Sequence, residues 1–488
     1  MRRLVTRTTL SLAKTLLNTI LAVFVLLTAA ASAQTFTVIQ NFNGTDGAAP
    51  EDTLTQGVDG NFYASATDGG TQELANGTAF KMSPSGAITT LYSFCDDDTC
   101  TDGCNPSAGL LQATNTGIYG TTRGCGLYGG GTIYKVGPAP GMTTIYNFCA
   151  LTNCDDGSFP NSLIQGSDGN FYATTLGGGT HSAPSQGGTV YKMTPAGVLT
   201  TLYNFRSQPN CADGDQPGAL VQATDGNFYG LTTIGGSLGA GSFFKITSHG
   251  VFTSLYGFCA LGNCADGREP GGIIQAADGD FYGTSAIGGN LNCKEVGCGV
   301  IFKITSAGVL TSLYIFCNTT GCPDGAGPAG MVQGTDGNFY GVTGAGGSHN
   351  AGTIFQMTPA GVLTTLHNFT VAEGLTPVGL MQATNGNFYG TAMFEGLYGD
   401  GTIYRLSMGL PAFAKTVPTL GRVGSSILIL GNNLIGTTRV KFNGTAAAFT
   451  VISASAIRTT VPTGATTGSV QVTTPTGTLT SNVVFTVN

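Results

Sequence analysis

Seven acidic residues, each followed by glycine, recur at corresponding places along the chain. Carboxylate oxygens are the ligands that calcium prefers, and they also accept hydrogen bonds from hydroxyl-rich ligands. One hypothesis is therefore an acidic rim that binds calcium or such a ligand. The alternative, which we favour, is a set of turns, because Asp-Gly forms tight turns whatever the function. The residues are Asp46, Asp102, Asp156, Asp213, Asp266, Asp324 and Glu373.

The densest acidic run, Asp96-Asp97-Asp98, is the best single calcium candidate. It lacks the further ligands of a loop such as the EF-hand. The sequence indicates no cofactor other than calcium, and for calcium it supplies only part of a site.

Thirteen cysteines give the chain a second kind of chemistry. Five pairs have four residues between their members, and four of those pairs directly follow a Tyr-x-Phe strand end. Many cysteines in an exported chain predict disulfides. The predicted pairs are Cys95–Cys100, Cys149–Cys154, Cys259–Cys264, Cys293–Cys298 and Cys317–Cys322, with Cys104–Cys125 as a sixth.

Cys211 matches the second cysteine of this pattern, but Arg206 stands in its partner's place, so we predict an unpaired thiol. Zinc is the competing interpretation of so many cysteines. The pairs sit in separate repeats, which argues against a shared zinc site.

Catalytic residues are not indicated. The histidines at 181, 249, 349 and 367 have no neighbouring nucleophile signature. A glycosidase needs two carboxylates at a defined separation, and seven equivalent acidic residues do not single out two. The chain has no tryptophan, which weakens any model of sugar stacking.

These residues must be positioned by a repeated unit. The phrase Asp-Gly-Asn-Phe-Tyr, with close variants, recurs at intervals of 49–58 residues, and such self-similarity predicts a repeat architecture. The seven copies end at Tyr63, Tyr119, Tyr172, Tyr229, Tyr282, Tyr340 and Tyr389.

Each copy resolves into four short strands, A to D. In the third copy these are expected at 162–167, 170–175, 188–194 and 198–205, with Asp168-Gly169 as a two-residue hairpin turn. The runs are rich in Val, Ile, Phe, Tyr and Thr, as strands prefer. Four antiparallel strands repeated seven times predict an all-β fold, a seven-bladed β-propeller.

The chain ends of the repeat region complement one another. The seventh copy reaches strand C at 401–406 but has no strand D, whereas the segment 36–42 aligns with the strand at 199–205. We expect the N-terminal strand to complete the last blade and close the ring, which removes the open sheet edges.

Propeller geometry places the A–B and C–D turns on one face and the B–C and D–A loops on the other. The B–C loops vary in length and the D–A loops carry most of the cysteine pairs, so we expect ligand binding on that second face. The Phe-Tyr of each B strand is interpreted as packing between blades rather than as a platform for sugars.

The repeated phrases resemble the tandem repeat called GloVer, found in exported bacterial proteins of a choice-of-anchor type. The resemblance covers about residues 35–407 and all seven copies. It implies an exported location and a repeat architecture, and it implies no biochemical activity.

Residues 409–488 differ from the repeats and are richer in Thr, Val and Ser. Strands are expected at 424–431, 439–444, 448–453, 469–474 and 482–487, which suits a small immunoglobulin-like β-sandwich. The motifs at 431–434, 440–444 and 461–468 resemble the IPT/TIG family, whose domains serve as spacers or contact modules.

The first 33 residues are typical of a signal peptide. Arg2, Arg3, Arg7 and Lys14 precede an apolar stretch too short to favour a membrane span, and Ala31-Ser32-Ala33 suits cleavage before Gln34. An uncleaved membrane anchor is the alternative. Removing these four from 19 basic residues leaves 15 against 26 acidic residues, a formal charge of −11. That charge argues against nucleic acid or an anionic membrane as partner.

The domains are therefore expected as signal peptide 1–33, propeller 34–408 and IPT/TIG-like domain 409–488. The favoured function is a secreted or cell-surface binding or adhesion module that acts through its loops on a polysaccharide or a surface protein. The alternatives are an extracellular polysaccharide lyase or glycosidase that uses acidic residues on the same face, and a structural envelope component.

Overall fold

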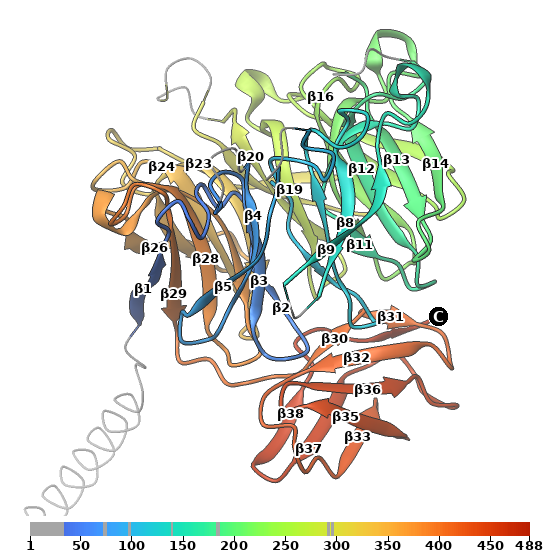
Figure 1. The fold of residues 1–488 in the computed structure, drawn as a ribbon. Helices are drawn as coiled ribbons and strands as arrows, with labels where there is room; N and C mark the ends of the chain where they lie inside the picture. Colours follow the sequence, from blue (N-terminus) through green and yellow to red (C-terminus); the bar gives the residue numbers. More distant parts are fainter. Residues whose placement is uncertain are drawn as a thin grey trace, which may run out of the picture.

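The computed structural model describes residues 34–71, 76–95, 99–137, 140–181, 186–289, 293 and 297–488. The predicted signal peptide and the calcium candidates Asp96, Asp97 and Asp98 lie outside the described residues. Apart from short 3-10 turns, the described elements are β-strands (Figure 1). No helix among the described residues has the length and apolar character needed to cross a membrane.

Within the described residues, the repeat region forms seven antiparallel sheets. The first three comprise β2 (Thr55–Gln56), β3 (Phe62–Ala66), β4 (Thr78–Met82) and β5 (Ile88–Ser93); β6 (Leu111–Gln112), β7 (Ile118–Thr122), β8 (Thr132–Val136) and β9 (Met142–Asn147); and β10 (Ser158–Pro160), β11 (Ile164–Gln165), β12 (Phe171–Gly177), β13 (Thr189–Met193) and β14 (Leu199–Asn204).

The next three comprise β15 (Asp215–Gln222), β16 (Phe228–Ile234), β17 (Ser242–Ile246) and β18 (Phe252–Gly257); β19 (Arg268–Gln275), β20 (Phe281–Ile287), β21 (Val300–Ile304) and β22 (Leu310–Ile315); and β23 (Ala326–Gln333), β24 (Phe339–Ala345), β25 (Thr353–Met357) and β26 (Leu363–Asn368). The last sheet combines β27 (Leu375–Gln382), β28 (Phe388–Phe394) and β29 (Thr402–Ser407) with the N-terminal β1 (Thr35–Asn41).

Strand β1 supplies the outer strand that the last copy lacks. It pairs antiparallel with β29 from Thr35 opposite Ser407 to Asn41 opposite Thr402. The ring of Phe36 also stacks on that of His367 at 3.7 Å between centroids. The two ends of the repeat region therefore meet in one sheet.

The expected two-residue turn at Asp168-Gly169 is wrong. Gln165 pairs with Phe171, and Gly166 N donates to Asn170 O at 2.8 Å, which leaves three residues at the tip. Gly169 has a φ of +83°, the left-handed conformation that such a three-residue hairpin needs. The Asp168 carboxylate accepts hydrogen bonds from the backbone and side chain of Asn170 and from the Tyr172 hydroxyl, the last at 2.8 Å. These bonds favour the three-residue loop over a two-residue turn.

The Phe-Tyr of the B strands, which is Ile118-Tyr119 in the second copy, packs between sheets. In most copies the tyrosine ring contacts the phenylalanine of the next copy, with ring centroids 4.1–4.6 Å apart, and Tyr389 contacts Phe62 of the first copy at 4.4 Å. The B strands are buried over residues such as 62–66 and 118–122 because a neighbouring sheet covers each face.

A glutamine ends strand A in every copy and joins that copy to the one before it. The Oε1 atom of each accepts a hydrogen bond of 2.8–3.1 Å from a backbone N–H of the preceding sheet. For the first copy, the donor is Thr384 N of the last sheet, which bonds to Gln56 at 3.0 Å. The set comprises Gln56, Gln112, Gln165, Gln222, Gln275, Gln333 and Gln382.

The C-terminal residues form two four-stranded sheets and one small parallel pair. Their strands are β30 (Lys415–Val417), β31 (Leu420–Gly421), β32 (Ser426–Leu430), β33 (Arg439–Phe442), β34 (Thr445–Ala447), β35 (Phe449–Ser453), β36 (Ala456–Thr460), β37 (Val470–Thr474), β38 (Gly477–Thr480) and β39 (Thr486–Val487). The expectation from sequence located five of these strands but omitted β30, β31, β34, β36 and β38.

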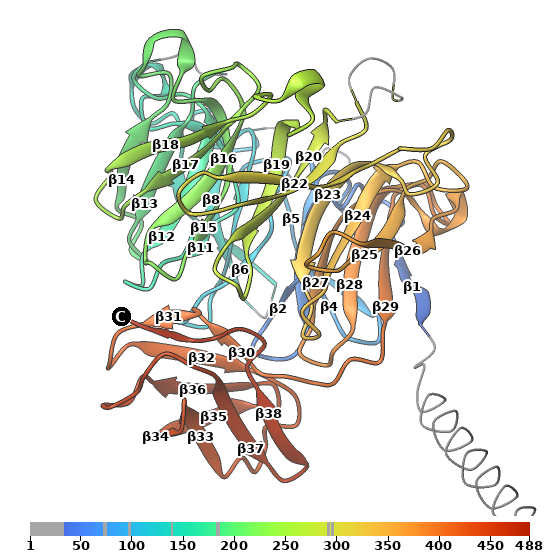
Figure 2. The same cartoon turned by 180° about the vertical axis from the view of Figure 1, so that it is seen from behind.

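This C-terminal part lies against the A–B turns of the repeat region, as both views show (Figures 1 and 2). Phe413 N donates to Thr384 O at 2.9 Å, Asn432 Nδ2 donates to Thr384 Oγ1 at 3.0 Å, and Ser453 Oγ donates to Val58 O. The turn face is thereby covered in part, while the B–C and D–A loops lie at the far ends of the strands.

Candidate binding face

The B–C and D–A loops, here called the loop face, lie away from the C-terminal sheets. Strand B runs from an A–B turn, where the C-terminal part packs, to a B–C loop, so these loops project at the opposite end (Figure 2). The seven acidic residues named above lie in the D–A loops of this face.

The acidic side chains of the D–A loops are engaged within their own loops. Asp156, Asp213 and Asp266 are each at most 1% exposed, and each accepts a hydrogen bond from a strand D tyrosine hydroxyl at 2.7–2.9 Å. Backbone N–H groups of the loop donate to the same carboxylates. Asp102 and Asp324 repeat the arrangement with Tyr92 and Tyr314. A buried carboxylate with several donors folds the loop around itself.

The two remaining acidic residues use other donors. Glu373 accepts from Thr370 N at 2.9 Å and lies 3.2 Å from His367 Nε2, where five other loops have Asp and Tyr. Asp46 accepts from Asn43 N at 2.9 Å and Gln40 Nε2 at 3.3 Å. The seven residues thus share a structural role, and binding of calcium or a hydroxyl-rich ligand by them stays a prediction.

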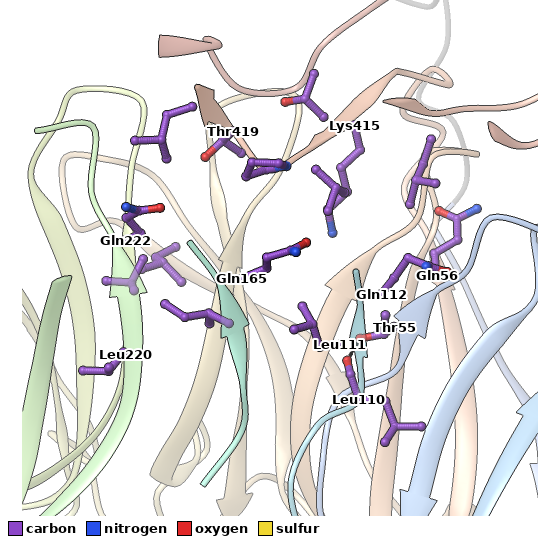
Figure 3. A pocket seen from close by; sticks show the side chains of 18 residues that line it. Thr55, Gln56, Leu110, Leu111, Gln112, Gln165, Leu220, Gln222, Lys415 and Thr419 are labelled. Atoms are coloured by element: carbon purple, nitrogen blue, oxygen red, sulfur yellow. Dashed lines mark hydrogen bonds between the residues drawn. The ribbon is translucent and has the colours of Figure 1, made fainter. Parts of the chain in front are cut away.

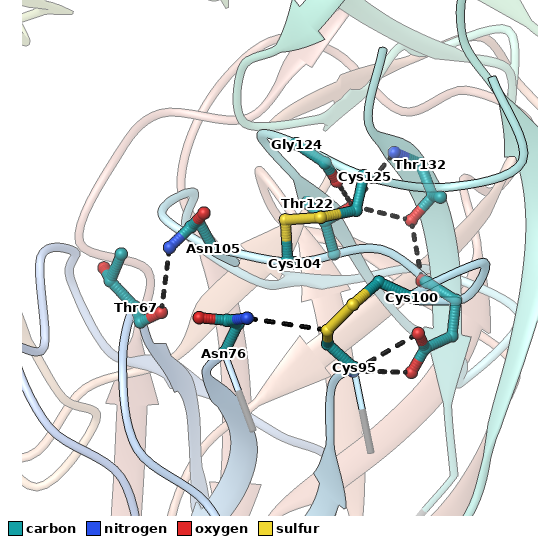
Figure 4. Close-up of a disulfide and its surroundings, with 11 residues drawn as sticks. Thr67, Asn76, Cys95, Cys100, Cys104, Asn105, Thr122, Gly124, Cys125 and Thr132 are labelled. Carbon is teal, nitrogen blue, oxygen red and sulfur yellow. Dashed lines mark hydrogen bonds between the residues drawn. A yellow bond between two sulfur atoms is a disulfide. The ribbon is translucent and has the colours of Figure 1, made fainter. Parts of the chain in front are cut away.

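Six disulfides join the described cysteines, in the pairs that the spacing indicates, and Cys211 is free. Figure 4 shows two of them, Cys95–Cys100 and Cys104–Cys125, side by side on the loop face. In each disulfide that joins cysteines five positions apart in a D–A loop, both cysteines have a positive φ, for example 62° at Cys149 and 58° at Cys154. The disulfides therefore restrain loops whose backbone is in a disfavoured conformation.

Two of these disulfides come together although they belong to different loops. The sulfur atoms of Cys293, Cys298, Cys317 and Cys322 all lie within 4.8 Å of one another, and Cys293 Sγ is 3.7 Å from Cys322 Sγ. The argument from separate repeats does not apply to these four, because both loops belong to the same sheet, β19-β20-β21-β22. They are paired as disulfides here, and only their reduced thiolates have the ligand set of a structural zinc site.

Large apolar side chains project from the tips of the B–C loops. Leu127 and Tyr128 are 57% and 53% exposed, and Leu397 and Tyr398 are 70% and 60% exposed. The backbone N–H groups of Leu127 and Leu397 donate to Asn147 and Asn41 Oδ1, both at 2.9 Å, which fixes the loop tips. Exposed aromatic and aliphatic side chains on a rigid support are typical of binding surfaces. The sequence analysis missed them, although the shared Gly-Leu-Tyr-Gly of residues 126–129 and 396–399 marks both tips.

An acidic pair, Glu51 and Asp52, lies just before the inner strand β2 of the first copy. Asp52 accepts from Thr53 N at 2.6 Å and from Ser162 Oγ of the third copy at 3.5 Å. Burial raises the pKa of Asp52 to about 6, and burial also raises the pKa of Glu51. Other copies have small residues here, such as Gly218 and Gly272. The sequence analysis missed this pair because a single Glu-Asp carries no periodic signal.

Comparison with known proteins decides the family. The model of the Gloeobacter/Verrucomicrobia repeat matches residues 22–217, 147–329 and 216–452, which together span most of the chain. The chain belongs to the Gloeobacter/Verrucomicrobia repeat family. Membership of this repeat family agrees with the resemblance to the GloVer repeat. No curated protein matches the chain.

Three solved structures resemble the chain at low sequence identity. The extracellular domain of a proposed one-component system from B. thetaiotaomicron has a TM-score of 0.50 and 9% identity, over 92% of this chain and 59% of that chain. PorZ, a surface component of the type-IX secretion system of Porphyromonas gingivalis, has a TM-score of 0.48 and 14% identity, over 92% and 60%. A proposed gluconolactonase has a TM-score of 0.40 and 11% identity, over 78% and 94%. At 9% identity, the likeness to the first of these structures concerns the fold alone.

Proposed function

We propose that the protein is an exported, non-enzymatic binding or adhesion module that engages its ligand with the loop face. The observation that carries the proposal is the set of exposed Leu and Tyr side chains on anchored B–C loop tips. Aromatic side chains lose little conformational entropy on binding and contribute large contact areas. The ligand is a polysaccharide or a surface protein.

The architecture that we propose for this module is a closed seven-bladed propeller followed by an immunoglobulin-like domain of the IPT/TIG type. Closure is supported by the β1–β29 pairing, by the contact of Tyr389 with Phe62, and by the bond from Thr384 to Gln56. The immunoglobulin-like assignment is supported by the sheets β30-β32-β36-β35 and β34-β33-β37-β38, with a shared core that includes Ile429 and Val472. This domain acts as a spacer on the turn face.

We place the protein outside the cell because disulfides, such as Cys104–Cys125 and Cys293–Cys298, persist in oxidising compartments. Cleavage of the predicted signal peptide before Gln34 then yields the working protein.

The second candidate function is a polysaccharide lyase or glycosidase. Asp52 favours it, because a carboxyl with a pKa near 6 can donate or accept a proton close to neutral pH. This candidate places the acid just before the inner strand β2 rather than among the seven acidic residues of the D–A loops.

The experiment incubates the chain from Gln34 with a panel of plant and microbial polysaccharides and with bacterial envelope proteins, with and without calcium. Retention without new chain ends supports the binding module, and loss of retention on chelation assigns calcium to it. New reducing ends or unsaturated products that disappear in Asp52→Asn would replace the binding proposal with the enzymatic one.

A further inference from the structure

A cavity of about 500 Å³ lies between the inner strands of the first five sheets and the first strands of the C-terminal part (Figure 3). It is remote from the loop face. Its wall on the repeat side is aliphatic, with Leu111, Ile164, Leu220 and Ile274, and Val417 lies on the opposite side. A concave, mostly apolar cavity of this size is typical of sites for small molecules.

One cation faces this apolar space. The side chain of Lys415, at the start of β30, points from the C-terminal part into the cavity (Figure 3). No Asp or Glu is among the described lining residues, and among the described residues the Lys415 ammonium has neither an ion pair nor a hydrogen bond. An ammonium group held in apolar surroundings is costly unless an anion accompanies it.

The glutamine amides around the cavity are already engaged. Gln165 Oε1 accepts from Thr114 N at 2.8 Å and its Nε2 donates to Gly169 O at 3.0 Å. Gln222 is held in the same way by Ser167 N and Gly226 O. These amides maintain contacts between sheets, so they are not oriented to solvate the ammonium.

A second polar group beside Lys415 lacks a partner. Thr416 lines the cavity and is 1% exposed, and its Oγ1 has no hydrogen-bond partner among the described residues. Buried hydroxyls are nearly always hydrogen-bonded. Thr416 is opposite Ile429 of the C-terminal core in the strand pairing, so its side chain leaves β30 on the face away from that of Lys415. The Lys415 ammonium is therefore the group in the cavity that can bind a carboxylate.

We propose that this cavity binds a medium-chain aliphatic monocarboxylate, whose carboxylate contacts Lys415 and whose chain lies against the aliphatic wall. The single cation selects one negative charge, and the wall selects an apolar body over a bare inorganic anion. This site is separate from the loop face and goes beyond the proposed function.

A neighbouring cavity supplies a route from solvent. Its volume is about 520 Å³, and it shares Val221, Gln222, Ile274 and Thr419 with the first. It extends along the C-terminal part to Val484, which is 49% exposed. An aliphatic chain can therefore enter between the repeat region and the C-terminal part without opening the sheets.

Binding is also expected to depend on pH. Burial lowers the pKa of Lys415, and a bound carboxylate favours its charged form. No other titratable group lines the cavity among the described residues. Affinity for the carboxylate should therefore fall as the pH rises through the lowered pKa, and binding should take up protons.

The test titrates decanoate into the chain from Gln34 by calorimetry at neutral pH. We expect binding at one site, weakened about tenfold or more in Lys415→Met, because a charge-assisted bond is lost. Lys441→Met, in β33 outside the cavity, should bind as the wild type does. Val221→Phe, which fills the cavity without removing charge, should also lose binding.

Three results would overturn the inference. They are no binding of decanoate to a folded wild-type chain, equal binding by Lys415→Met, and decylamine or inorganic phosphate binding as tightly as decanoate. Thermal unfolding of each variant, measured in the same buffer without decanoate, separates lost binding from lost folding.

Discussion

In the D–A loops, where the acidic residue differs between copies, the residue that contacts it differs as well, so that the contact is kept. Six loops hold an aspartate, and five of these bond it to a tyrosine hydroxyl of strand D. In the loop before β27 both residues differ, since Glu373 meets His367. The Glu373 side chain is longer than that of aspartate and the His367 side chain is shorter than that of tyrosine, so the contact is kept although both residues differ. The contact that folds the loop therefore matters more than the identity of either residue.

The exchange at Arg206 lacks such compensation and leaves Cys211 free. Arg206 has a φ of 62°, as the first cysteine of the other pairs does, and its Nε lies 3.2 Å from Cys211 Sγ. We predict that Arg206→Cys forms a seventh disulfide and stabilises the protein by about 2 kcal/mol, from the closure entropy of a short loop. Thiol titration should show no free cysteine, and the denaturation midpoint should rise. A variant that keeps two free thiols would contradict the equivalence of the loops.

Asp52 makes stability depend on pH. Its pKa, raised by burial to about 6 from 3.8, means that the folded state holds this proton more tightly than the unfolded state. Its contribution is thus fully present below about pH 4 and is lost as the pH rises through 6. Asp52→Asn should therefore unfold at a higher temperature than the wild type at pH 8, with a smaller difference at pH 4.5. An equal difference at both pH values would refute the raised pKa.

At the scale of elements, sequence periodicity was enough to locate most strands. The sequence alone shows the seven repeated phrases that end in tyrosine, the missing last strand and the match of segment 36–42 to a D strand. The three-residue tip at Asp168 was not, because the hydrogen bonds of Asp168 to Asn170 and Tyr172 favour it over a two-residue turn. Likewise Lys415, Thr416 and Asp52 carry no pattern, since their surroundings come from strands far apart in sequence.

Removal of β1 tests the element that joins the two ends of the repeat region. A chain that begins after Asn41 leaves the edge of β29 unpaired and removes Phe36 from His367. We predict a lower unfolding temperature and self-association, because an open strand edge pairs with other chains. Light scattering after size exclusion measures the association, and a synthetic peptide of residues 35–42 should restore the monomer. A truncated chain that stays monomeric and equally stable would show that β1 does not complete the sheet.

At the scale of the whole molecule, the turn face and the loop face of the repeat region have different roles. The turn face is occupied by the C-terminal part, through contacts such as Phe413 to Thr384. The loop face keeps its exposed Leu and Tyr side chains and its disulfides. Much of this division could be predicted from the lengths of the loops. The exposed tips are marked in the sequence only by the shared Gly-Leu-Tyr-Gly of residues 126–129 and 396–399, because the same residue types also fill the core.

The most direct measurement compares two four-residue variants for retention on the polysaccharide and envelope-protein panel. One replaces Leu127, Tyr128, Leu397 and Tyr398 with serine on the loop face. The other, which serves as the matched control, replaces four valines at the C–D turns with serine. These valines are 63–64% exposed and comprise Val198, Val251, Val309 and Val362. The account predicts that the loop variant loses retention by about tenfold or more while the control binds as the wild type does. Equal retention by the loop and control variants would contradict binding through the loop face.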